Sequence, residues 1–151
     1  MKKFQFHMQK LLSYKEQTLD SELMNLAVLN GLLRREIEKL NQLKSEQAKH
    51  KEEFELKIRN QITPAAYRMY DSYAQYLVEN IRMCEEEIAL IEDQIEKQIG
   101  RVKELKIETK SLETIKEHRY EEYKKENIKK NERLMDEFVS RGRIVEKSQI
   151  G

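Results

Sequence analysis

A single proline, Pro64, interrupts a chain whose remaining sequence favours helix over nearly its whole length. Proline has no amide hydrogen and a fixed φ, so it fits the first turn of a helix but not its interior. Thr63 is a suitable N-cap, because its hydroxyl can accept a hydrogen bond from a free amide of the first turn. We therefore expect one helix over about residues 4–59, a turn over residues 60–63 and a second helix over about residues 64–139.

Apolar side chains recur every seven residues in both expected helices, which is typical of a coiled coil. In the first helix one seam series comprises Leu12, Leu19, Leu26, Leu33, Leu40, Gln47 and Phe54. Its companion series comprises Glu16, Leu23, Asn30, Ile37, Lys44, Lys51 and Ile58, with Leu29 and Leu43 widening the stripe. The two series of the second helix comprise Tyr67, Ala74, Ile81, Ile88, Ile95, Val102 and Thr109, and Tyr70, Leu77, Cys84, Ile91, Gln98, Leu105 and Leu112.

Two amphipathic helices joined by a short turn must pack antiparallel to bury both seams. The predicted fold is all-α, a long two-helix antiparallel coiled-coil hairpin that forms a single domain over residues 1–139. A chain with 38% charged residues could instead be disordered, but disordered chains lack a sustained apolar period. Residues 140–151 have no such period and are predicted to form a frayed or disordered tail.

Pairing the two seams in one register places Ile58 beside Tyr70 and Asn30 opposite Gln98. A buried amide that faced leucine would lack a hydrogen-bond partner, whereas two facing amides can pair. Asn30 and Gln98 are therefore either a polar layer that fixes the register or two side chains that reach out to solvent.

The second helix is predicted to overhang the first, since the same register ends with Leu12 facing Lys116. The apolar positions also shift beyond residue 112, in the manner of a coiled-coil stutter. We expect the segment from about Tyr120 to Phe138 to be helical, with its apolar side uncovered and available to a partner.

The sequence offers no chemistry typical of an enzyme, a cofactor site or a metal site. Its three histidines are far apart in the expected hairpin, and it has no glycine-rich phosphate loop or nucleophile motif. Cys84 occupies a seam position and is expected to be a small buried apolar residue. The net charge of +1 gives no basis for nucleic-acid binding. The lone cysteine and the lack of a long apolar run lead us to expect a cytosolic protein.

Two groups of aromatic residues exceed what a bare hairpin needs. Tyr67, Tyr70, Tyr73 and Tyr76 recur every three residues, so some of them must leave the seam and face outward. The second group joins the aromatic N-terminus, Phe4-Gln5-Phe6, to the segment Met135-Asp136-Glu137-Phe138. Each group is either an anchor for a partner protein or part of the packing at one end of the hairpin.

The chain resembles the FliJ family of the bacterial flagellar export apparatus in the order of its short motifs. These are Phe4-Gln5-Phe6 leading to Gln9, Leu11-Leu12 and Lys15-Glu16; the turn Ile62-Thr63-Pro64 with aromatic residues after it; and Met135-Asp136-Glu137-Phe138. The resemblance implies a non-enzymatic monomer, similar to the central stalk of rotary ATPases, at the cytoplasmic face of the cell membrane at the flagellar base. It further implies insertion into the hexameric ring of the export ATPase, contact with the membrane export gate and escort of export chaperones.

The resemblance also assigns candidate binding residues, to which the overhang adds Leu134. The candidates that face the ATPase are Phe4, Phe6, Leu11, Leu12, Lys15, Glu16, Leu134, Met135, Asp136, Glu137 and Phe138. The candidates that face the export gate are Tyr73 and Leu77, although Leu77 is also a seam position. Two alternatives stay open: the equivalent stalk of a virulence secretion system, and a structural coiled coil that self-assembles through its C-terminal stripe.

Overall fold

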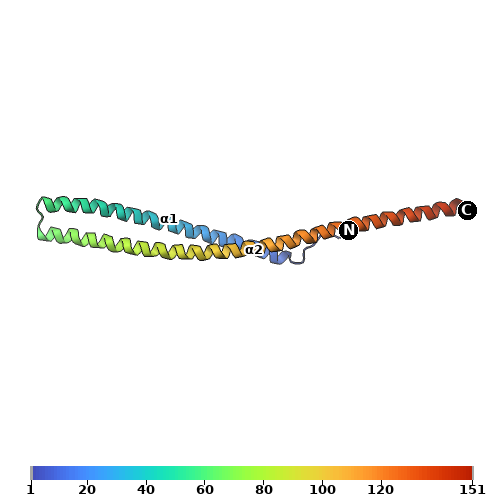
Figure 1. Ribbon diagram of the computed structural model, residues 1–151, viewed down its shortest axis with the longest axis horizontal. Coiled ribbons are helices and arrows are strands. Elements are labelled where there is room, and N and C mark those ends of the chain that lie inside the picture. The colour runs from blue at the N-terminus through green and yellow to red at the C-terminus, as the bar shows by residue number, and fades with distance from the viewer. Residues whose placement is uncertain (1, 151) are drawn as a thin grey trace. The chain divides into compact units, whose positions relative to one another are not determined.

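The computed structural model describes residues 2–150, which form two helices, α1 (Gln9–Arg59) and α2 (Pro64–Ile150) (Figure 1). No strand occurs among these residues. The helices pack antiparallel: near the turn His50 of α1 contacts Tyr70 of α2, and farther from it Glu22 contacts Gln98. The predicted all-α helical hairpin is confirmed.

The turn between the helices is fixed by a cap and by one unusual backbone conformation. Thr63 Oγ1 accepts a hydrogen bond from the Ala66 amide at 3.2 Å, which is the N-cap interaction that the sequence predicts. Gln61 has a φ of 59°, in the left-handed region that costs a residue with a Cβ about 1 kcal/mol or more. This residue reverses the chain within the few positions available between Arg59 and Pro64.

The outer ends of both helices differ from the prediction. α1 begins at Gln9 rather than near Phe4, because the side chains of Phe4 and Phe6 pack against α2 from a non-helical segment, residues 2–8. α2 continues to Ile150, so residues 140–150 are helical and not the predicted tail; Gly151 lies outside the described residues. No proline follows Pro64, and the single glycine in this stretch, Gly142, costs a helix only about 1 kcal/mol.

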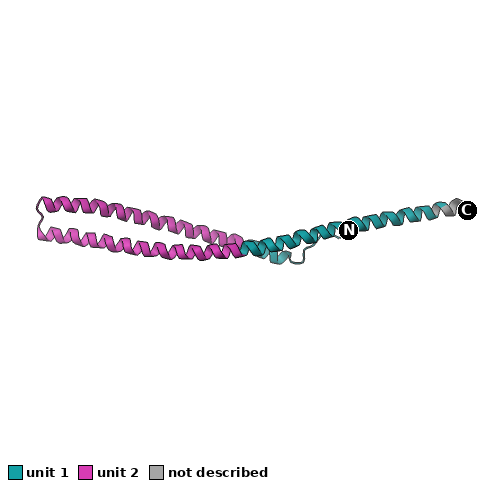
Figure 2. Ribbon diagram, in the orientation of Figure 1, with its two compact units in different colours: residues 1–18, 105–151 teal, residues 19–104 magenta. Residues whose placement is uncertain are grey.

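The hairpin divides into two compact units rather than the single predicted domain (Figure 2). Unit 1 contains residues 1–18 and 105–151, and therefore the start of α1 with the second half of α2. Its core consists of Phe6, Leu12 and Leu112, with Phe4 and Met8 packed against them. Unit 2 contains residues 19–104 and includes the turn.

On α2 the buried residues belong to the two predicted heptad series. On α1 only one of the two predicted series is buried as expected. In unit 2 Leu77, Cys84, Ile91 and Val102 are buried, and in unit 1 Leu105, Thr109 and Leu112 are buried. On α1 the series with Leu26 and Leu33 is partly buried as predicted. The companion series is displaced by one residue, since Glu22 and His50 are buried while Leu23 and Ile37 are exposed.

The register differs from the prediction by eight residues along α1. Tyr70 contacts His50 and not Ile58, and Gln98 contacts Glu22 and not Asn30. In each observed pair, the midpoint in sequence between the two residues is residue 60, next to the turn. In each predicted pair this midpoint is Pro64, which lies inside α2. Residues at equal distances from the turn must face each other in a tight hairpin, which explains the shift.

Candidate partner-binding surfaces

An exposed apolar surface lies on α2 in unit 1. Leu134 and Phe138 are one helical turn apart and share a face with the adjoining pair Met135 and Val139. All four are exposed, and Phe138 is the most open of them at 76%. The charged residues Asp136 and Glu137 are exposed between them. Large apolar residues clustered in this way are typical of a protein-binding site.

The N-terminal segment covers the part of α2 that precedes this surface. Phe4 lies 5.3 Å from the ring of Tyr120 and 5.5 Å from the ring of Tyr123, measured between centroids. The Tyr123 hydroxyl donates a hydrogen bond to the Lys2 carbonyl. The prediction that the apolar side is uncovered from Tyr120 onward is therefore wrong for this first part, although it holds for Leu134 and Phe138.

A groove joins the N-terminal segment to the exposed apolar surface. Its lining includes Lys2 and Phe4 from the segment, and Tyr123, Asn127 and Leu134 from α2. Phe4 is partly buried, so one side of its ring remains accessible there. The groove thus places an aromatic ring, an amide and a leucine on one continuous surface of unit 1.

The ATPase-binding candidates separate into core and surface residues, all of them in unit 1. Phe6 and Leu12 are buried in the core and present no surface to a partner, because their side chains hold the N-terminal segment and α1 against Leu112. Lys15 forms a salt bridge with Glu108 at 2.5 Å. The exposed candidates are Leu11, Glu16, Leu134, Met135, Asp136, Glu137 and Phe138.

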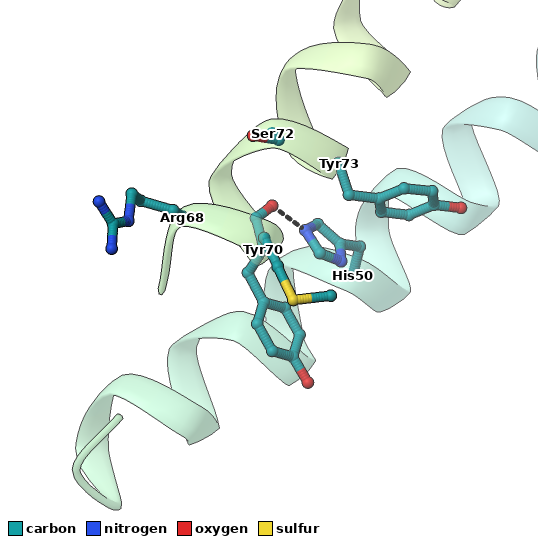
Figure 3. A pocket seen from close by; sticks show the side chains of 6 residues that line it. His50, Arg68, Tyr70, Ser72 and Tyr73 are labelled. Carbon is teal, nitrogen blue, oxygen red and sulfur yellow. Dashed lines mark hydrogen bonds between the residues drawn. The ribbon is translucent and has the colours of Figure 1, made fainter. Parts of the chain in front are cut away.

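An aromatic cluster surrounds His50 in unit 2, near the turn. The His50 ring stacks on Tyr70, with centroids 5.4 Å apart and planes 18° from parallel, and it meets Phe54 and Tyr73 edge-on. His50 Nε2 lies 2.8 Å from the Tyr70 carbonyl oxygen (Figure 3). Because a carbonyl only accepts, Nε2 carries the proton and donates it in this contact.

A shallow pocket opens beside this cluster. It has a volume of about 660 Å³, and its lining includes His50, Met69, Tyr70 and Tyr73 (Figure 3). Tyr73 is 42% exposed, so part of its side chain is accessible at the pocket. Burial raises the pKa of the Tyr73 phenol, and the nearby Glu46 carboxylate adds to this effect. The phenol is therefore a neutral hydrogen-bonding group at physiological pH.

The other gate-binding candidate, Leu77, is fully buried. Its burial follows from its seam position, because a leucine in the seam packs between the two helices and leaves no surface for a partner. Met69 and His50, which line the pocket, were not predicted as site residues. His50 appears isolated in the sequence, and only the corrected register brings it to Tyr70.

The predicted polar layer of Asn30 and Gln98 does not exist. Asn30 is exposed, and Gln98 Nε2 instead donates to the Glu22 carbonyl at 2.9 Å and to the Glu22 carboxylate at 2.5 Å. Arg101 lies 3.5 Å from the same carboxylate. The hydrogen bond from Gln98, helped by the charge of Arg101, lowers the pKa of Glu22.

Cys84 is buried in the seam as predicted. Its Sγ lies 3.4 Å from both the backbone carbonyl and the carboxylate of Glu36. Burial raises the pKa of the thiol, and the Glu36 hydrogen bond and charge raise it further. Cys84 is thus held as a neutral thiol.

No group of three or more metal-ligating side chains occurs among the side chains that the structure describes. In the same part of the chain, neither helix contains a stretch apolar enough to cross a membrane.

Comparison with known proteins decides the family. The model of the flagellar FliJ protein family matches residues 4–148, which is nearly the whole chain. The chain belongs to the FliJ family. No curated protein and no solved structure matches it significantly. FliJ membership confirms the predicted resemblance and makes the chain a component of flagellar protein export, a structural part of that apparatus rather than an enzyme.

Proposed function

We propose that this FliJ-family chain binds the export ATPase ring through unit 1 and promotes assembly and activity of the ring. The observation that carries the proposal is the exposed apolar surface of Leu134, Met135, Phe138 and Val139, with the groove to Phe4 beside it. Burying one phenylalanine side chain contributes about 1.5–3 kcal/mol, so this surface can supply a binding hot spot.

The proposal narrows the binding residues to those that unit 1 leaves accessible. Phe138 and Leu134 form the apolar centre, and the partly buried Phe4 borders it through the groove. Phe6 and Leu12 support this surface from the core without contacting the ATPase. Substitution of these two residues should therefore impair binding only together with the fold of unit 1.

Titration of the full chain against purified export ATPase tests this assignment. Phe138→Ala should weaken binding about 10- to 100-fold and lower the stimulated ATP turnover, because the lost contact area is apolar. Ile107→Ala is the matched control, since Ile107 lies on α2 in the same unit and is 68% exposed. Equal binding by Phe138→Ala and wild type, with unchanged helicity, would exclude this surface.

We further propose that the pocket beside Tyr73 in unit 2 docks the membrane export gate and that the chain also escorts export chaperones. The pocket offers an accessible tyrosine and methionine on a rigid aromatic base, which is a suitable anchor for a protein partner. Tyr73→Ala should weaken gate binding and leave ATPase stimulation unchanged. Tyr14→Ala, an exposed tyrosine of unit 1, should leave gate binding unchanged.

These activities place the chain in the cytoplasm, at the cytoplasmic face of the membrane at the flagellar base. The equivalent stalk of a virulence secretion system would present similar surfaces. Binding measurements with both ATPases distinguish the two, since a flagellar stalk should prefer the flagellar enzyme. The exposed surface around Phe138 also leaves self-assembly through the C-terminal stripe as an alternative, and concentration-dependent oligomers that Phe138→Ala abolishes would identify it.

A further inference from the structure

The part of α1 between Leu23 and Leu33 is apolar on nearly all sides, although the hairpin covers only one of them. Leu26, Leu29 and Leu33 face the seam and are partly buried. Met24 and Val28 point away from it and are 70% and 61% exposed. A helix that is apolar all round is ordinarily covered all round, so this outer side has the composition of an interface.

We call this side the outer face of α1 and define it by Asp20, Met24, Ala27, Val28, Gly31 and Arg35, all in unit 2. At 3.6 residues per turn, Met24 and Gly31 lie at its centre, opposite the seam. Ala27 and Val28 lie on either side of that line. Asp20 lies at the N-terminal end of the face and Arg35 at its C-terminal end, and neither forms an ion pair with a side chain that the structure describes.

Gly31 is unexplained by the hairpin itself. A Cβ built on Gly31 would come no closer than 4.0 Å to another group, the Arg35 guanidinium, so alanine would fit. Glycine inside a helix is less stable than alanine. A missing side chain becomes useful when a second helix must approach closely at that point.

The outer face is complementary to itself in the antiparallel direction. If two copies of α1 are related by a two-fold axis between Ala27 and Val28, Met24 of one copy lies over Gly31 of the other. The same pairing brings Ala27 of one copy beside Val28 of the other. At both ends it brings the Asp20 carboxylate to the Arg35 guanidinium. An apolar centre with opposite charges at its two ends is what a two-fold symmetric contact requires.

We propose that the outer face of α1 binds the same face of a second copy of this chain, antiparallel, and so forms a dimer. A contact over four helical turns falls among the small interfaces, so the dimer is transient, and at low protein concentration the chain is the monomer that the resemblance implies. This inference goes beyond the proposed binding of the ATPase and the export gate, which uses other residues.

Sedimentation of the full chain with exchanged charges tests the proposal. Asp20→Arg and Arg35→Asp should each weaken dimerisation at least about tenfold, because each dimer then contains two like-charged pairs. An equimolar mixture of these two variants should dimerise as wild type does, since every pair across a mixed dimer is again of opposite charge. A mixture that associates no better than its separate components overturns the antiparallel dimer.

Two further variants separate the contact from effects on folding. Met24→Lys should weaken dimerisation at least about tenfold, while Met83→Lys, on an exposed methionine of α2 in the same unit, should not. Gly31→Ala should raise the melting temperature of the hairpin yet weaken dimerisation, because the methyl group occupies the space of Met24 from the other copy. Equal losses in the two methionine variants, or a wild-type chain that stays monomeric up to about 1 mM, overturn the proposal. Binding of another protein's helix to this face of a monomeric chain overturns it as well.

Discussion

Gln98 and Glu22 are joined by two hydrogen bonds across the seam of unit 2, one to the Glu22 backbone carbonyl and one to its carboxylate. Glu22 is buried at a position where a coiled coil ordinarily holds an apolar residue. A carboxylate placed there needs partners, and Gln98 and Arg101 supply them. This pair replaces the predicted layer of two amides. Because one partner is a carboxylate, the stability of the seam depends on pH.

Gln98→Leu should lower the melting temperature at pH 7, because it removes the main hydrogen bond that holds the Glu22 carboxylate. The pKa of Glu22 is lowered in the folded chain, so the stability it contributes is present above 4.5 and is lost as pH falls through the folded value. The difference in melting temperature between variant and wild type should therefore shrink at pH 3. Gln94→Leu, at an exposed position, is the control. A difference of the same size at pH 7 and pH 3 would contradict the role of the carboxylate.

Cys84 should react slowly with a thiol reagent such as DTNB in the native chain. Burial and the neighbouring Glu36 raise the pKa of its thiol, and the reagent attacks the thiolate. At pH 8 we expect the native rate to be at least about tenfold below the rate in urea. A Met83→Cys, Cys84→Ala variant moves the thiol to an exposed position one residue away and should react rapidly. Equal native rates for the two thiols would show that the seam opens readily at this point.

Thr109→Val should leave stability unchanged or raise it by about 1 kcal/mol. The Thr109 hydroxyl is buried without a hydrogen-bond partner among the described residues, so a methyl group of similar size removes an uncompensated polar group. Thr114→Val should have little effect, because that hydroxyl is exposed and bonds the Lys110 carbonyl. Urea unfolding measures both. A clear loss of stability in Thr109→Val would indicate that an internal water satisfies the hydroxyl.

Leu77→Ala should destabilise the chain by about 2–5 kcal/mol, because it leaves a cavity in the seam. Leu90→Ala, at an exposed position of the same helix, should change stability by less than about 0.5 kcal/mol. Thermal unfolding followed by circular dichroism distinguishes the two. If Leu77→Ala instead weakened gate binding at unchanged stability, Leu77 would be a contact residue after all.

The sequence predicts α2 better than α1 for a physical reason. The seam series of α2 are apolar at almost every position, from Leu77 through Cys84 and Ile91. On α1 the true companion series holds Glu22, Glu36 and His50, so its apolar content is no higher than that of the neighbouring series. Periodicity alone cannot show which of the two neighbouring series faces the seam, because the burial of Glu22 and His50 depends on partners from α2.

The exposure of the candidate residues was predicted in part, whereas their roles in binding stay predictions. Aromatic spacing correctly placed an accessible tyrosine after the turn, and the resemblance pointed to the exposed segment at Phe138. The non-helical segment over residues 2–8 was missed, because its conformation is decided by contact of Phe4 with Tyr120 and Tyr123, more than a hundred residues away in sequence. Phe6 is buried with Leu12 and Leu112, and the local sequence carries no sign of that contact with a residue of α2.

The tight turn at Gln61 also sets the order in which the chain assembles. The contact of His50 with Tyr70 joins residues 20 apart, that of Lys15 with Glu108 joins residues 93 apart, and that of Tyr123 with Lys2 joins residues 121 apart. Closing a short loop costs less entropy than closing a long one, so the helices zip together from the turn outward. During synthesis α1 leaves the ribosome long before its counterpart exists. Its leucines stay uncovered until α2 emerges, and Phe4 is among the last residues to dock.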